Sequence, residues 1–121
     1  MIAGTYNIYC EEGTTFTRVL TILVPDEVDP EITTPYDLSN HTARMQVRRT
    51  ITTQDAMVEL TTENGGLTID DGNGSITIEM SDQVTASLTS SGVYDLEIID
   101  GSGNVSRVVQ GTFTLSPEVT R

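Results

Sequence analysis

The sequence predicts an all-β domain built from short antiparallel strands. Apolar and polar residues alternate in several short runs, turns rich in Gly and Asn separate these runs, and threonine is frequent whereas lysine and tryptophan are absent. Alternation with a period of two gives a strand one buried and one exposed face. Threonine is β-branched and suits a half-exposed pleated surface. The 121 residues are expected to form one domain, residues 1–121.

The clearest predicted element is a hairpin over residues 66–80. Asp-Asp-Gly-Asn-Gly at 70–74 separates two alternating runs, and its Asn-Gly step accepts positive φ at low cost, as a tight reversal requires. The residues expected to face the core share one parity on each side of this turn: Leu67, Ile69, Ile76, Ile78 and Met80.

Four further strands are predicted before this hairpin. They cover residues 5–10, 14–24, 41–49 and 56–62, and the third has the most regular alternation. In the second, Arg18 stands among apolar residues of one parity. Either a bulge shifts the register near Arg18 or both faces of that strand are partly covered.

The pattern changes after the hairpin. Ser81 is a suitable N-cap for a short helical crossing over residues 81–88. Two strands follow, 92–99 and 105–115, joined by a turn at 100–104. The inward parity changes within the last strand, and a bulge at Gly111 would explain this change.

Seven or eight short strands with one short helical crossing predict an immunoglobulin-like antiparallel β-sandwich. The paired cysteines around a tryptophan that mark true immunoglobulin domains are missing, because Cys10 is the single cysteine and tryptophan is absent.

Residues 25–36 are expected to form a long loop. Pro25, Pro30 and Pro35 stand there with four acidic residues, and proline has no N–H to donate to a strand ladder. With Tyr36 following, the segment is either a solvated connection, the favoured interpretation, or a docking segment ordered by a partner.

The net charge of −12 disfavours binding to nucleic acid and to anionic membranes. Arg44, Arg48 and Arg49 stand out because positive charge is scarce, and Arg44 and Arg48 share one exposed strand face. Pairing with nearby carboxylates is the favoured interpretation. The alternative is an arginine patch for an assembly partner, since arginine is enriched at interfaces.

No catalytic, metal or cofactor site is predicted. Cys10 ends an apolar strand face and is expected in the core, while His41 is expected at the surface without a nucleophile beside it. The acidic stretches 70–74 and 100–104 lack the ligand order of a calcium loop and are interpreted as hairpin turns. We therefore expect no enzyme activity and no cofactor.

Several runs resemble a family of small structural proteins of tailed bacteriophages. Their order is similar to that in the N-terminal domain of phage baseplate upper proteins and of related proteins associated with tail fibres. The resemblance covers nearly the whole chain, although each motif is a strand pattern. The runs are TTFTR at 14–18, DLS at 37–39, TARMQVR at 42–48, GLTI at 66–69, GSITI at 74–78, YDLEI at 94–98 and GTFTLSPEVTR at 111–121.

The resemblance implies an immunoglobulin-like sandwich that docks onto a virion after synthesis in the host bacterial cytoplasm. Because the sequence ends at Arg121, we expect no fibre shaft or receptor-binding head. This favours an adaptor or connector of the tail or baseplate, present in several copies in a symmetric assembly with other virion proteins. The alternatives are a decoration protein of the head or neck and a carbohydrate- or host-surface-binding module using Tyr6, Tyr9 or Tyr36.

Overall fold

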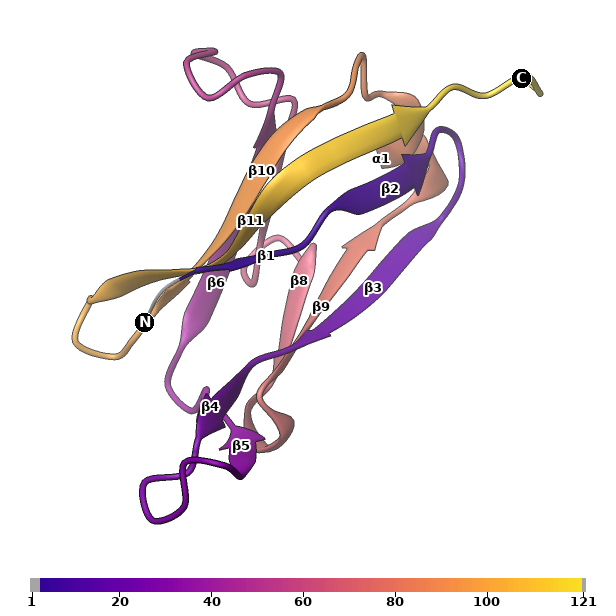
Figure 1. Ribbon diagram of the computed structural model, residues 1–121. Helices are drawn as coiled ribbons and strands as arrows, with labels where there is room; N and C mark the ends of the chain where they lie inside the picture. Colours follow the sequence, from indigo (N-terminus) through magenta and orange to yellow (C-terminus); the bar gives the residue numbers. More distant parts are fainter. Residues whose placement is uncertain (1–2, 121) are drawn as a thin grey trace.

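The computed structural model describes residues 3–120, and over this range the protein is mostly β-strand with one short α-helix (Figure 1). The prediction of an all-β chain is therefore confirmed. The helix α1 spans Asp82–Ala86 and a 3-10 turn, η1, spans Asp71–Asn73. The strands are β1 (Gly4–Thr5), β2 (Ile8–Glu11), β3 (Phe16–Thr21), β4 (Leu23–Pro25), β5 (Thr33–Pro35), β6 (Thr42–Arg48), β7 (Val58–Thr61), β8 (Leu67–Asp70), β9 (Ser75–Met80), β10 (Gly92–Ile99) and β11 (Val105–Ser116).

The strands form two main sheets and a small hairpin. The larger sheet has the order β1-β11-β10-β6-β7, with β2 also paired to β11, and the smaller sheet has the order β3-β9-β8. Strands β4 and β5 pair with each other and project beyond the end of the smaller sheet (Figure 1). Pairing is antiparallel except that β1 and β2 run parallel to β11, which departs from the purely antiparallel expectation.

The two sheets share one apolar core. Within each of β6, β9 and β10, every second side chain points inward, as the sequence predicted. The inward residues of these three strands are all buried: Ala43, Met45, Val47, Ile76, Ile78, Met80, Tyr94, Leu96 and Ile98. Phe113 of β11 and Ile8 of β2 complete this core from the larger sheet, each fully buried.

The hairpin at residues 66–80 forms as predicted, but its reversal is longer than a two-residue turn. The 3-10 turn Asp71–Asn73 precedes Gly74, whose φ is 61°. A Cβ at Gly74 would lie 2.9 Å from the backbone N and O of Tyr36. Gly74 is therefore needed both for its left-handed conformation and for the close approach of the segment that follows β5.

The predicted strand 14–24 is split into β3 and β4, and both alternatives offered for Arg18 are wrong. The register with β9 is continuous from Phe16 opposite Met80 to Thr21 opposite Ser75, so no bulge occurs. Val19 of the other parity is 56% exposed, so the outer face is not covered. Arg18 instead lies at the rim of the core, where its guanidinium stacks 5.3 Å from the Phe16 ring centroid.

A bulge does occur in β11, but not at Gly111. The register shifts between Leu96 opposite Val109 and Glu97 opposite Arg107, which leaves Val108 as the extra residue. Ser106 lies opposite the buried Ile98 before the shift and Val109 lies opposite the buried Leu96 after it, so the bulge explains the observed change of parity. Gly111 is instead paired regularly with Tyr94.

The expectation that residues 25–36 form one long loop is also corrected, because β4 and β5 pair within it. Hydrogen bonds from Asp26 N to Ile32 O (2.7 Å) and from Tyr36 N to Ile22 O (2.9 Å) flank this ladder. Pro25 and Pro35 occupy the alternate positions, where the backbone N points away from the partner strand. Their missing N–H groups therefore cost the ladder nothing, and the true loop is 26–32.

The helical crossing is confirmed between β9 and β10. The Ser81 hydroxyl caps α1 by accepting the N–H of Val84 at 3.2 Å. Thr85 is fully buried, and its hydroxyl donates to the carbonyl of Thr14 at 2.7 Å. This bond ties the helix to the connection between β2 and β3, so the crossing is anchored to both sheets.

Candidate functional site

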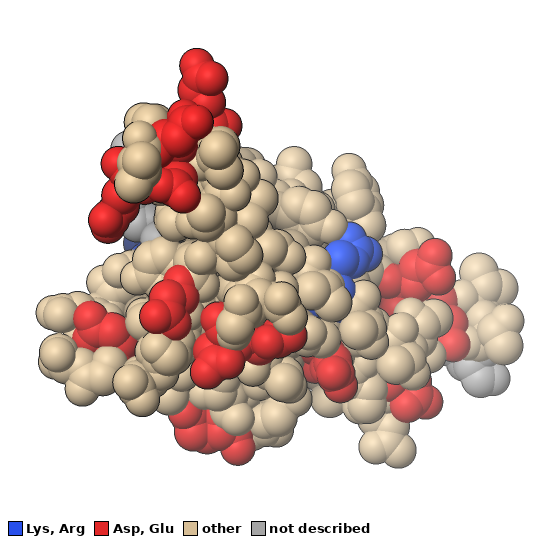
Figure 2. All heavy atoms as spheres, turned by 90° about the horizontal axis from the view of Figure 1, so that it is seen from below, with Lys and Arg blue, Asp and Glu red and all other residues tan. Residues whose placement is uncertain are grey.

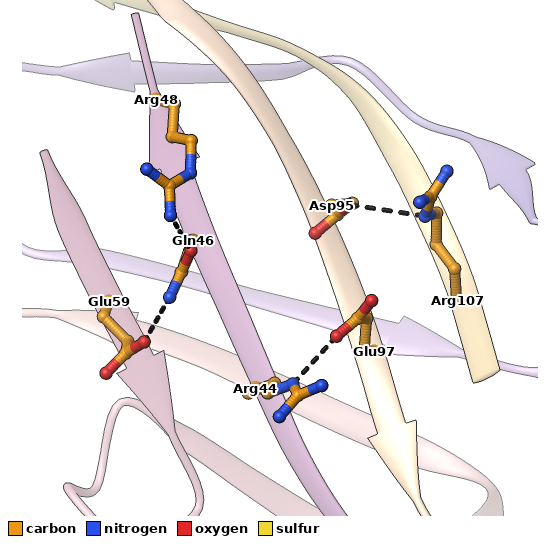
Figure 3. A network of polar contacts seen from close by, with 7 residues as sticks. All are labelled: Arg44, Gln46, Arg48, Glu59, Asp95, Glu97 and Arg107. Atoms are coloured by element: carbon orange, nitrogen blue, oxygen red, sulfur yellow. Dashed lines mark hydrogen bonds and ion pairs between the residues drawn. The ribbon is translucent and has the colours of Figure 1, made fainter. Parts of the chain in front are cut away.

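The outer face of the larger sheet carries a network of charged and amide side chains. These residues project from four adjacent strands, at the outward positions that alternate with the buried ones. Figure 3 shows them as neighbours across β7, β6, β10 and β11: Glu59, Arg44, Gln46, Arg48, Asp95, Glu97 and Arg107.

Two ion pairs cross this face. Arg44 Nε donates to Glu97 Oε1 at 2.8 Å between β6 and β10. Arg107 Nε lies 3.3 Å from Asp95 Oδ2 between β11 and β10, and Arg107 Nη1 also donates to Gln110 at 3.2 Å. The pairing of Arg44 with a nearby carboxylate, which the sequence favoured, is confirmed.

Gln46 extends the network to the edge of the sheet. Its amide donates to the Glu59 carboxylate, and its Oε1 accepts from Arg48 Nη2 at 2.6 Å. Arg48 also donates to the carbonyls of Thr53 at 3.0 Å and Gln54 at 2.5 Å, which orders the connection after β6. Arg48 is thus held by neutral acceptors, whereas the sequence favoured carboxylate partners.

Arg49 does not join this network. It follows the last residue of β6 and is exposed, and its Nε lies 3.4 Å from Ser90 Oγ in the connection before β10. Of the three arginines singled out from the sequence, Arg44 and Arg48 therefore lie on the same outer face, and Arg49 lies outside the network.

Part of the same face is hollowed into an open concavity of about 520 Å³. Arg48 and Gln46 line it from β6, and Arg107 and Gln110 line it from β11. Ile51, 85% exposed, contributes an apolar side chain to its lining. Three arginines and three carboxylates on this face cancel in charge, so on a protein of net charge −12 it is a neutral surface.

The ion pair between Arg44 and Glu97 is expected to contribute little to stability. Arg44 is 49% exposed and Glu97 25% exposed, so water screens the attraction. A double-mutant cycle with Arg44→Gln and Glu97→Gln should give a coupling free energy of about 0.2–1 kcal/mol by urea unfolding. A coupling several times larger would show that the network acts as a cooperative structural unit rather than as a solvent-facing surface.

The second candidate site is the arm formed by β4, β5 and loop 26–32. Pro25, Pro30 and Pro35 are exposed along it, whereas Tyr36 at its base is half-buried with its ring edge-on to His41 at 5.7 Å. The predicted proline and tyrosine positions thus belong to one projecting structure, with Tyr36 holding its base.

The tip of the arm is organised by its own carboxylates. Asp26 Oδ1 accepts the N–H of Val28 at 2.8 Å, and Asp29 Oδ1 accepts the N–H of Glu31 at 3.2 Å. Such side-chain to backbone bonds stabilise turns. The tip nevertheless exposes apolar surface, because Val28 is 93% and Ile32 54% exposed.

Charge is distributed unevenly around this arm. Seen from below the view of Figure 1, acidic side chains gather on the projecting arm and also spread over the rest of that face, where few basic side chains are visible (Figure 2). The loop contributes four acidic residues within residues 26–31. The arm therefore presents apolar residues within a strongly negative surface.

Asp37, Tyr94 and Asp100 have shifted pKa values, and each of them forms hydrogen bonds with the backbone of a turn or a strand. Backbone and side-chain N–H groups of Asn104 lower the pKa of the Asp100 carboxyl, which organises the turn between β10 and β11. The Ser39 N–H likewise lowers the pKa of Asp37. Burial raises the pKa of the Tyr94 hydroxyl, which donates to the Tyr6 carbonyl at 2.5 Å. These groups stabilise turns and strand contacts.

Cys10 and His41 have surroundings close to those expected. Cys10 is buried in the core, as predicted, and burial raises the pKa of its thiol, which disfavours the reactive thiolate. His41 is half-buried, and its Nδ1 lies 2.8 Å from the carbonyl of Ser39. Within residues 3–120, no group of three or more potential ligands is placed to hold a metal ion.

The three tyrosines considered for carbohydrate stacking differ in exposure. Tyr9 is 70% exposed on β2. Tyr6 is half-buried, and the guanidinium carbon of Arg18 lies 5.9 Å from its ring centroid. Tyr36 is half-buried against His41.

In the described part of the chain, no helix is long and apolar enough to cross a membrane.

The sequence did not identify Gln46, Glu59, Asp95 and Arg107 as members of a network. The alternating sequence pattern predicts that their side chains point outward, but it does not predict which strands are neighbours in the sheet.

Comparison of the chain with protein-family models and with curated proteins finds no match.

Proposed function

We propose that this protein is a structural virion protein of a tailed bacteriophage, an adaptor or connector of the tail or baseplate that acts by protein–protein contact. The observation that carries the proposal is the projecting arm, whose tip exposes Val28 almost completely on an ordered hairpin. The resemblance of the strand motifs to phage baseplate proteins supports the choice of assembly.

We further propose that the architecture is an immunoglobulin-like sandwich. Two facing sheets enclose one core, and the chain passes from the smaller sheet to the larger through α1. Short hairpin connections join β8 to β9 and β10 to β11. These features support the proposal, and the parallel pairing of β1 and β2 with β11 would be a variation on it.

The arm has the physical properties of a docking element. An exposed valine gains free energy when a partner covers it, and the turns at the tip reduce the entropy lost on binding. The surrounding carboxylates favour a partner with a basic rim around an apolar recess, because complementary charge accelerates association and selects the partner. The same charges disfavour nucleic acid as the partner.

Replacing residues 27–31 with an Asn-Gly turn between the hydrogen-bonded positions Asp26 and Ile32 tests this proposal. The variant should fold, because the loop packs little against the core, and should unfold at nearly the wild-type denaturant concentration. We expect at least a tenfold loss of incorporation into tailed phage particles, measured by quantitative mass spectrometry of purified particles.

Two point variants sharpen the test. Val28→Ser removes the apolar tip, while Val119→Ser removes an equally exposed valine, 91% against 93%, near the end of the chain. Only the first should reduce incorporation. Equal incorporation of the loop variant and wild type would remove the arm from the proposal. Absence of the wild-type protein from purified particles would overturn the virion function itself.

The carbohydrate-binding alternative now depends on Tyr9. An exposed aromatic ring can stack on a sugar, and Tyr9 offers one. A glycan array probed with wild type and Tyr9→Ala would support this alternative if binding were seen and then lost in the variant.

A further inference from the structure

Strand β3 is an unusually open sheet edge. It lies at the outside of the smaller sheet, where β9 pairs with its other side (Figure 1). It has six residues, Phe16–Thr21, and its register with β9 runs without a bulge. A long, regular edge strand exposes backbone groups that can pair with another strand.

The direction of these backbone groups follows from the pairing with β9. Ile22 N donates to Gly74 O at 2.8 Å, so the even-numbered residues of β3 direct their N–H and C=O groups toward β9. The odd-numbered residues Thr17, Val19 and Thr21 therefore direct theirs to the free edge. Their side chains are also exposed and uncharged.

Other edges within residues 3–120 are shorter or interrupted. Strands β7 and β8 have four residues each, and β7 carries Glu59. Strands β4 and β5 carry Pro25 and Pro35, and the edge of the larger sheet is divided between β1 and β2. Short length, charge and proline are the usual means of protecting an edge.

We propose that two copies of this protein associate by antiparallel pairing of their β3 strands about a two-fold axis at Val19. Val19 of one copy lies opposite Val19 of the other, and Thr17 lies opposite Thr21. The two smaller sheets become one continuous six-stranded sheet. The interface is isologous, as most protein dimers are.

The occupant is a second copy because the edge is complementary to itself. Thr17, Val19 and Thr21 are spaced symmetrically about Val19, so all three outward backbone positions find partners in one register. A net charge of −12 makes most contacts between copies repulsive, but β3 contains no acidic residue.

Arg18 does not oppose this pairing. Its side chain points inward, where the Phe16 and Tyr6 rings cover its guanidinium and the Tyr6 hydroxyl accepts a hydrogen bond from it. In the proposed register Arg18 lies opposite Leu20 of the second copy. Like charges are therefore not placed directly opposite each other, which is the arrangement that destabilises strand pairs.

A cysteine at the two-fold axis tests the register. In Val19→Cys the two Cα atoms would be about 5.5 Å apart, within the range of a disulfide. Mild oxidation should give a covalent dimer on a non-reducing gel. Val105→Cys is the control, because Val105 is similarly exposed, 48% against 56%, but lies on β11 of the larger sheet.

A charge exchange provides a second readout. Val19→Glu and Val19→Arg each place like charges opposite each other at the axis, so each should be monomeric by sedimentation velocity under conditions where wild type is dimeric. Their equimolar mixture should recover the dimer, since the charges are then opposite. A merely structural role for Val19 predicts no recovery on mixing.

The proposal is overturned if wild type sediments as a monomer at all concentrations tested, or if Val19→Cys and Val105→Cys crosslink equally. It does not rest on the virion function. A dimer in solution with no copies in phage particles would keep this inference and reject that function, and a monomer found in particles would do the reverse.

Discussion

Replacement of Phe113 by alanine is expected to lower the free energy of unfolding by about 3–5 kcal/mol. Phe113 is fully buried on β11 and is the largest of the fully buried side chains. It belongs to the core cluster that both sheets share, so its removal leaves a cavity between them. The close packing of protein interiors prevents full collapse of such a cavity.

Urea unfolding of Phe113→Ala and Thr112→Ala measures this effect. Thr112 is the neighbouring residue on the same strand, and its side chain is exposed. We expect a large decrease in the midpoint for Phe113→Ala, an unchanged slope, and a small change for Thr112→Ala. Similar small changes in both variants would mean that the two sheets do not depend on one common core.

Local alternation predicted the strands well where a strand has one buried and one exposed face. In β6, the alternation of Ala43, Met45 and Val47 with polar residues is reproduced as alternating burial, and the same holds for Tyr94, Leu96 and Ile98 of β10. The side-chain direction in a strand depends on local geometry, so sequence parity is sufficient to predict it.

Contacts between strands were harder to predict because they depend on which strands are neighbours. Arg44 reaches Glu97 across 53 positions of the chain, and no local pattern indicates that β6 pairs with β10. The pairing of Arg107 with Asp95 depends additionally on the bulge at Val108. The charged face was therefore visible as a set of outward residues, but not as a network.

The environments of proline and arginine residues are hard to predict from local sequence for a different reason. The missing N–H of proline predicts a loop for Pro25 and Pro35, yet a missing N–H matters only at positions where it would face the partner strand. The charge of Arg18 suggests a break in the alternating pattern, but aromatic rings cover its guanidinium at the rim of the core. Both outcomes depend on three-dimensional partners that the sequence does not show.

Gly111 is required because another segment of backbone crosses it closely. A Cβ at Gly111 would lie 2.3 Å from the carbonyl oxygen of Tyr6. Tyr6 N donates to Gln110 O at 2.9 Å, and Asn7 Oδ1 accepts the N–H of Thr112 at 3.1 Å. The link between β1 and β2 is therefore held tightly against β11 on both sides of the glycine.

Gly111→Ala is accordingly expected to lower the free energy of unfolding by about 3 kcal/mol, at the upper end of overpacking effects, because a backbone atom must move. The displacement would also weaken the hydrogen bond from the Tyr94 hydroxyl to the Tyr6 carbonyl. Gly72→Ala is the matched control, since a Cβ there has no atom within 4 Å. Urea unfolding measures both variants, and hydrogen exchange should show faster exchange in β2 for Gly111→Ala alone. Wild-type stability of Gly111→Ala would mean that the Tyr6–Asn7 link can lift from β11 without cost, and that the parallel pairing of β1 and β2 contributes little to the fold.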